Sequence, residues 1–172
     1  MKNTVTRTLI FTAFAFLAFA AASHAEQDIF FCTNAAKGFS GDREFGNCAR
    51  LIAVGEQIRR PVDDGSGETR RRGDVELGPI QMFKDFDAVS VALRKLALRG
   101  IVFDAQIYFR DGNSQVYLTM ELADVVVQSI GMDARPEGAA EAVELSARRV
   151  TWRYDYGKAG SDEYSWDFEI GG

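Results

Sequence analysis

The chain has 172 residues and a formal net charge of −5 at pH 7. This length suits one compact domain with a sizeable core. The acidic balance argues against nucleic acid as a partner, because a negatively charged protein is repelled by the phosphate backbone.

The first 25 residues have the pattern of a secretory signal peptide. Lys2 and Arg7 form a positive start, an apolar run covers residues 9–22, and small residues lead to Ala25. The apolar run is shorter than the roughly 20 residues of a membrane-spanning helix, which favours cleavage after Ala25 over a retained anchor. We therefore expect a mature domain of residues 26–172 that is periplasmic or secreted, with no stable membrane anchor.

Removal of the signal would also remove His24, the only histidine of the chain. Catalytic Ser-His-Asp and Cys-His arrangements use imidazole as their base, so the mature chain would lack the group that they need. We expect no enzyme and no cofactor.

The two cysteines, Cys32 and Cys48, would mature in an oxidising compartment, where a disulfide persists. Their 16-residue step lacks the CxxC spacing typical of zinc sites. This pattern favours a structural disulfide over a metal or redox site.

Two strands are expected near the mature N-terminus, at residues 29–32 and 49–58, joined by a glycine-rich stretch at 38–46. A charged loop follows at residues 59–73. It carries five arginines, at Arg59, Arg60, Arg70, Arg71 and Arg72. Since arginine pairs with a carboxylate through two parallel hydrogen bonds, one interpretation is that the loop docks on an acidic surface of a neighbouring subunit or partner. The alternative is a solvated loop.

The same loop contains Asp63, Asp64 and Glu68 around two glycines. Their spacing misses the EF-hand pattern of acidic residues before a glycine. A calcium site is therefore disfavoured, and no metal is expected.

One amphipathic helix is predicted from Asp87 to Arg99, where Val89, Leu93 and Leu96 fall on one helical face together with Ala97. Asp87 is a suitable N-cap. Gly100 then supplies the residue that commonly ends a helix.

Alternation of apolar and polar side chains dominates the remaining chain and predicts half-buried strands. The strands are expected at residues 103–110, 115–127, 143–156 and 164–168. The alternation changes phase at Ala123-Asp124 and again at Arg148-Arg149, and each change predicts a bulge or bend. Long bent strands favour a closed or nearly closed barrel.

Four aromatic residues follow this alternation, at Trp152, Tyr154, Trp166 and Phe168. Their spacing matches a buried face, which predicts core packing. The alternative is that they line a ligand cavity at the mouth of the barrel.

Glu121 and Asp124 could be interpreted as the acid and base of a glycosidase-like site. A three-residue step places them on opposite faces of a regular strand, so a surface role is expected instead.

Five segments in order carry a family resemblance: Asp28–Phe31, Ile80–Asp87, Tyr117–Val127, Val150–Tyr154 and Tyr164–Phe168. The ordered set resembles the Hcp family, the haemolysin-coregulated proteins that form the inner tube of type VI secretion systems. The resemblance implies a mainly β fold, an Hcp-like β-barrel of two packed antiparallel sheets with one flanking α-helix. It also implies hexameric rings that stack into a tube, and no enzymatic activity. The loop at residues 59–73 would correspond to the family's extended loop, which reaches the neighbouring ring.

The expected function is therefore that of an exported, non-enzymatic Hcp-like structural or interaction protein. Its partners would be further copies of itself or other secretion-system and envelope proteins. The alternative is a monomeric periplasmic binding module that uses the barrel and the arginine-rich loop. The signal peptide and the cysteine pair depart from the family pattern, because its tube proteins assemble in the cytoplasm.

Overall fold

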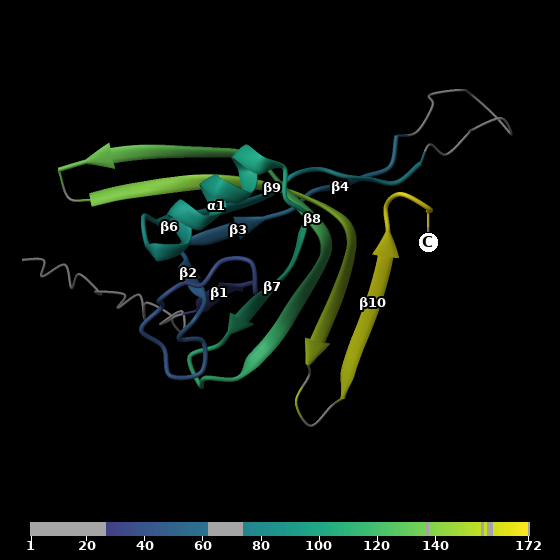
Figure 1. Cartoon of the computed structure of the whole chain (residues 1–172). Helices are drawn as coiled ribbons and strands as arrows, with labels where there is room; N and C mark the ends of the chain where they lie inside the picture. The colour runs from purple at the N-terminus through teal and green to yellow at the C-terminus, as the bar shows by residue number, and fades with distance from the viewer. Residues whose placement is uncertain (1–26, 62–73, 137, 156, 158–159, 172) are drawn as a thin grey trace, which may run out of the picture.

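The computed structural model describes residues 27–61, 74–136, 138–155, 157 and 160–171 (Figure 1). The expected signal peptide and Arg70, Arg71 and Arg72 lie outside these described residues. Within the described ranges, no helix is both long and apolar enough to cross a membrane.

The described chain is mainly β, with one helix. The elements are β1 (Asp28–Cys32), β2 (Ala49–Leu51), β3 (Ala53–Gly55), β4 (Ile58–Arg59), β5 (Glu76–Leu77), β6 (Ile80–Asp85), α1 (Ala88–Arg99), β7 (Phe103–Arg110), β8 (Val116–Arg135), β9 (Gly138–Asp155) and β10 (Ser161–Asp167). Eight strands form one antiparallel sheet in the order β2-β1-β7-β8-β9-β6-β3, with β10 pairing on β9. β4 and β5 pair only with each other.

The sheet curls into a nearly closed barrel because its two ends are consecutive in the chain. β2 pairs with β1 at one end and β3 pairs with β6 at the other. Only Ile52 separates these two strands, and its backbone N–H donates to the carbonyl of Phe83 across 2.7 Å. The barrel and its flanking helix confirm the fold class expected from the sequence.

The prediction of a single strand at residues 49–58 was wrong in detail, because the structure divides this segment into three short strands. The chain changes partner there, first pairing with β1, then with β6, and then leaving the barrel in the β4–β5 arm. The alternation did not reveal β6 as a strand. Its buried positions are Ile80, Met82 and Lys84. Because one of them is a charged lysine, the alternation of apolar and polar residues that would predict a strand is interrupted.

Both changes of phase are bends, as predicted. Asp124 has a φ of 53°, and the register between β7 and β8 shifts by one residue beside it. The backbone N–H of Asp124 donates to a carboxylate oxygen of Asp104 across 3.1 Å. Arg148 on β9 pairs with Asp124 across 3.3 Å, and β8 and β9 bend together (Figure 1). The register between these two strands shifts further along, between Val127 and Ser129.

The helix confirms its predicted ends and its buried face. The carboxylate of Asp87 accepts the backbone N–H groups of Val89 and Ser90, and Gly100 closes the helix with a φ of 60°. Val89, Leu93 and Leu96 are buried against the barrel. The remaining core consists of inward side chains of the sheet, among them Phe31, Ile107, Leu122, Val143 and Val150.

Candidate interaction surfaces

The disulfide expected from the sequence joins Cys32, the last residue of β1, to Cys48, the residue before β2. Their Cα atoms are 4.5 Å apart. The bond closes the glycine-rich connection, which passes close to the barrel at Gly38. A side chain at this position would meet the backbone of Cys48 at 2.5 Å, so the close approach requires glycine.

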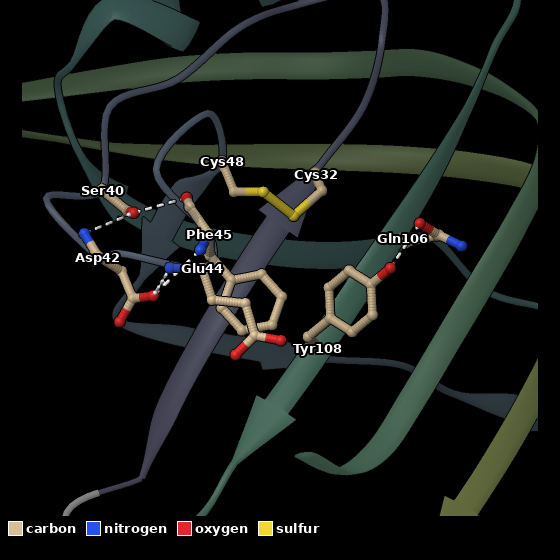
Figure 2. The surroundings of a disulfide bond; sticks show 8 residues. All are labelled: Cys32, Ser40, Asp42, Glu44, Phe45, Cys48, Gln106 and Tyr108. Carbon is tan, nitrogen blue, oxygen red and sulfur yellow. Dashed lines mark hydrogen bonds between the residues drawn. A yellow bond between two sulfur atoms is a disulfide. The ribbon is translucent and has the colours of Figure 1, made fainter. Parts of the chain in front are cut away.

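An aromatic cluster packs beneath this connection. The rings of Phe30 and Phe45 stack at 4.6 Å, and the ring of Tyr108 lies 5.0 Å from that of Phe45. Figure 2 shows the disulfide with Phe45 and Tyr108 beside it. The cluster, with Cys48, forms a second small core outside the barrel interior.

Arg110 ties the same connection to the barrel wall. Its guanidinium contacts Asp28 at 2.8 Å and Asp42 at 2.6 Å, and it lies 4.9 Å from the centre of the Phe30 ring. The hydrogen bond from Arg110 and those from the backbone N–H groups of Phe45 and Glu44 lower the pKa of Asp42 to about 2. The sequence did not reveal this ion pair, which joins residues 68 positions apart.

A polar groove of about 490 Å³ is lined in part by the disulfide. Its lining includes Glu121, Arg149, Gln106 and both cysteines. Glu121 accepts a hydrogen bond from Arg153 across 3.1 Å. Glu121 and Asp124 are thus each ion-paired with a different arginine, as a surface role predicts.

A second groove, of about 540 Å³, contains most of the aromatic residues expected in the core. It is lined by Trp152, Tyr164, Trp166 and Phe168 together with Glu56, Ile58, Arg60 and Val75. Tyr164 is 60% exposed and Tyr154 is 40% exposed, and the tryptophans are only partly buried. Trp152 and Phe168 pack against the barrel core while they line the groove, as predicted. The prediction of core packing was wrong for Tyr154, which is exposed, and for Trp166, which is partly buried on β10 outside the core cluster.

One carboxylate faces these aromatic rings. The indole N–H of Trp152 donates to Glu56 across 2.9 Å. Loss of water around the carboxyl raises the pKa of Glu56, although the hydrogen bond from Trp152 acts in the opposite direction. Glu56 remains partly accessible to solvent and so can meet a positively charged group.

The β4–β5 arm carries the described part of the arginine-rich loop. Arg59 pairs in register with Glu76 and donates to the side chain of Gln57 across 2.6 Å. Arg60 is exposed at the rim of the aromatic groove. The structure therefore separates the two described arginines, one held within the arm and one facing the groove. Asp63, Asp64 and Glu68 lie outside the described residues.

A buried ion cluster, missed in the sequence, fixes α1 to the barrel. Lys84 is fully buried and contacts Asp87 at 2.7 Å and Glu141 at 3.0 Å, and Arg94 contacts Glu141 at 2.6 Å. Burial alone would raise the pKa of Glu141, but hydrogen bonds from Ser90, Arg94 and Lys84 together lower it. Every member has a charged or hydrogen-bonding partner, which fits a structural role.

Among the described residues, no group of three or more His, Cys, Asp or Glu side chains is arranged to hold a metal ion. The charged groups described above lie in ion pairs or along open grooves. Such an arrangement is suited to contact with other molecules.

Comparisons with known proteins agree on one family. The profile described as "Type VI secretion system effector, Hcp" matches residues 30–154. No curated protein matches the chain in sequence.

Solved structures share the fold. Hcp1 from Salmonella typhimurium is 21% identical with a TM-score of 0.75, and the match covers 84% of this chain and 97% of that one. A type VI secretion system effector from Yersinia pestis is 19% identical with a TM-score of 0.70, covering 81% of this chain and 99% of that one. A further type six secretion system protein is 14% identical with a TM-score of 0.76, covering 86% and 99%.

Proposed function

Since this chain belongs to the Hcp family of type VI secretion system effectors, we propose that it is an exported member of the family that assembles with further copies of itself into hexameric rings. The family is one of structural tube proteins, and the chain has its barrel over nearly the full length of the related structures. The signal-like N-terminus and the Cys32–Cys48 disulfide support export to the periplasm or beyond.

The observation that carries the proposal is the arm formed by β4 and β5. It extends away from the barrel (Figure 1), and its two strands pair with no other described strand. Arg60 lies at its end and forms no ion pair with another described residue. The segment 59–73, which begins in β4, has five arginines and three carboxylates on an otherwise acidic chain, a charge pattern that supports contact between like subunits in head-to-tail arrangement.

Sedimentation velocity of the mature protein tests this proposal. We expect wild type to form species larger than a monomer at low salt, and we expect less assembly at high salt, because charges more than about 10 Å apart are screened at 0.1 M. Replacing Arg59 and Arg60 by Ala, or Arg70, Arg71 and Arg72 by Ala, should weaken assembly without changing the circular dichroism spectrum. Arg99→Ala, which removes an exposed arginine at the end of α1, is the matched control.

Two results would count against the proposal in different ways. A wild type that stays monomeric at every concentration and salt would contradict self-association and favour the monomeric binding module. Assembly that is indifferent to the arm substitutions but present in wild type would remove only the role of the arm.

A further inference from the structure

The aromatic groove contains both tryptophans of the chain, Trp152 and Trp166. Tyr164 and Trp166 lie two residues apart on one face of β10, with ring centres 6.3 Å apart and planes 24° apart. Trp152 is directly opposite Tyr164 on β9. The β4–β5 arm forms the other wall through Ile58 and Arg60. Large, partly exposed aromatic surfaces gathered in one groove mark a contact site more often than a solvated face.

The groove lies beside an open sheet edge. β10 pairs with β9 from Ser161 to Asp167, and no other described strand pairs with it (Figure 1). Half of its backbone N–H and C=O groups therefore lack a strand partner. An edge of this kind can accept a further strand through main-chain hydrogen bonds.

The charge of this edge selects the strand that it can accept. β10 contains Asp162, Glu163 and Asp167 and no basic residue. Asp162 is on the same strand face as Tyr164 and Trp166, and Glu56 lies across the groove. Two β10 edges brought together would face each other with like charges, which disfavours pairing between two copies through this edge.

We propose that the outer edge of β10 and the aromatic groove together bind an extended segment of a partner protein in which every second residue, on the face toward the groove, is apolar or basic. The backbone of the segment adds to β10 as a strand. Its apolar side chains enter the groove between Tyr164, Trp166 and the arm, and its basic side chains meet Asp162 and Glu56.

This inference does not rest on the ring assembly proposed above, because it concerns a partner of different sequence. Charge complementarity and the unpaired edge together favour a basic extended peptide over an acidic one and over a second copy.

Intrinsic tryptophan fluorescence provides a direct test, since both tryptophans of the chain lie in the groove. The probe is an acetylated and amidated arginine–valine peptide of the repeat valine–threonine–arginine–threonine, which places valine and arginine on one face of a strand and contains no tryptophan. We expect saturable change in the emission together with heat of binding in calorimetry. A peptide with glutamate in place of arginine, and an arginine–valine peptide N-methylated at every amide, should bind at least about tenfold more weakly.

Substitutions in the protein locate the site. Tyr164→Ala and Glu56→Gln should each weaken the arginine–valine peptide by about tenfold, and both leave the two tryptophans in place as reporters. Ser165→Ala, on the opposite face of β10, is the matched control and should bind like wild type. Thermal melts of the variants establish that they are folded.

Three outcomes would overturn the inference. One is the absence of both heat and fluorescence change with the arginine–valine peptide. A second is equal binding of the arginine and glutamate peptides, which would remove the charge argument. The third is a fall in the sedimenting mass of assembled protein on Tyr164→Ala, which would show that a second copy occupies the groove.

Discussion

A pair of charged side chains holds the connection between β1 and β2 against the barrel wall. Arg110 on β7 holds Asp42, and the carboxylate of Asp42 also accepts the backbone N–H groups of Glu44 and Phe45 at 2.8 and 3.0 Å. The folded state thus binds the ionised form of Asp42 strongly. This one side chain links the disulfide loop to the barrel wall.

The first prediction concerns acid stability. The pKa of Asp42 is lowered from 3.8 to about 2 on folding, so its ionised form contributes stability above pH 3.8. That contribution should be lost as the pH falls through about 2, because protonation then removes the charge that Arg110 binds. Asp42→Asn should lower the free energy of unfolding at pH 7 by about 1–3 kcal/mol and flatten the decline in Tm below pH 4.

Denaturant unfolding between pH 2 and 7 measures both effects. Asp133→Asn, an exposed carboxylate near the β8–β9 turn, serves as the control. If the free energy of unfolding of Asp42→Asn changes with pH in parallel with that of wild type, the pKa of Asp42 is not lowered in the folded protein.

At the scale of elements, α1 is joined to the barrel by an apolar face and by buried ions at its start. Leu93 is fully buried at 0% exposure, while Leu98 on the outer face of the same helix is 89% exposed. Lys84 and Glu141 bring β6 and β9 to the first turn of the helix. The helix therefore has one orientation that satisfies both its apolar stripe and its cap.

The second prediction separates these two faces. Leu93→Ala should lower the free energy of unfolding by about 2–5 kcal/mol, because it removes buried methyl groups and leaves a cavity. Leu98→Ala makes the same chemical change at an exposed site of the same helix and should cost less than about 0.5 kcal/mol. Thermal melts or urea titrations distinguish the two. Equal losses of unfolding free energy in the two variants would contradict the burial of Leu93 and the exposure of Leu98.

At the scale of the whole molecule, the barrel closes through two strands that are consecutive in the chain. After β1 the chain makes a connection without regular strands, and it then forms β2 at one end of the sheet and β3 at the other. The disulfide between Cys32 and Cys48 shortens this connection in the unfolded state as well as in the folded one. It thereby limits the loss of chain entropy when the barrel closes.

The third prediction follows from this constraint. The Cys32→Ser, Cys48→Ser double variant should be less stable than the oxidised wild type by about 3 kcal/mol, the value expected for a loop of this length. The matched comparison is the wild type unfolded with and without reductant. Unfolded, unreduced mature protein should show no free thiol in titration. Two reactive thiols per chain would contradict the disulfide.

Much of the fold could be predicted from the sequence because its signals are local. Asp87 and Gly100 marked the ends of the helix, and the alternation in Phe103–Arg110 marked both strand and facing. The phase change at Asp124 marked the bend. Each of these depends on residues within a turn of helix or a few strand positions. The cysteine pair was also readable, since only two cysteines are present.

The candidate sites were harder to predict because they depend on which segments meet. A lysine is normally exposed, and only the folded structure brings Glu141 and Asp87 beside Lys84 to stabilise it in a buried position. The alternation of apolar residues therefore did not predict β6 as a strand. Trp166 has the alternation of a core residue, yet it lies on β10, which pairs with β9 and with no other described strand, and it lines a groove. Whether one face of a strand is buried depends on which other segments pack against it, and the spacing of residues along that strand does not predict those segments.

The sequence by itself thus determined the mainly β class, the single helix with its ends, the bends of the long strands and the chemistry available for a disulfide. The tertiary structure decided the partner change from β2 to β3 that closes the barrel, the Arg110 and Lys84 ion pairs, and the exposure of the aromatic groove beside the free edge of β10. The reason is physical. Backbone propensity and periodicity act between neighbours in the chain, whereas ion pairing, desolvation and the covering of an apolar face are set by residues that only folding brings together.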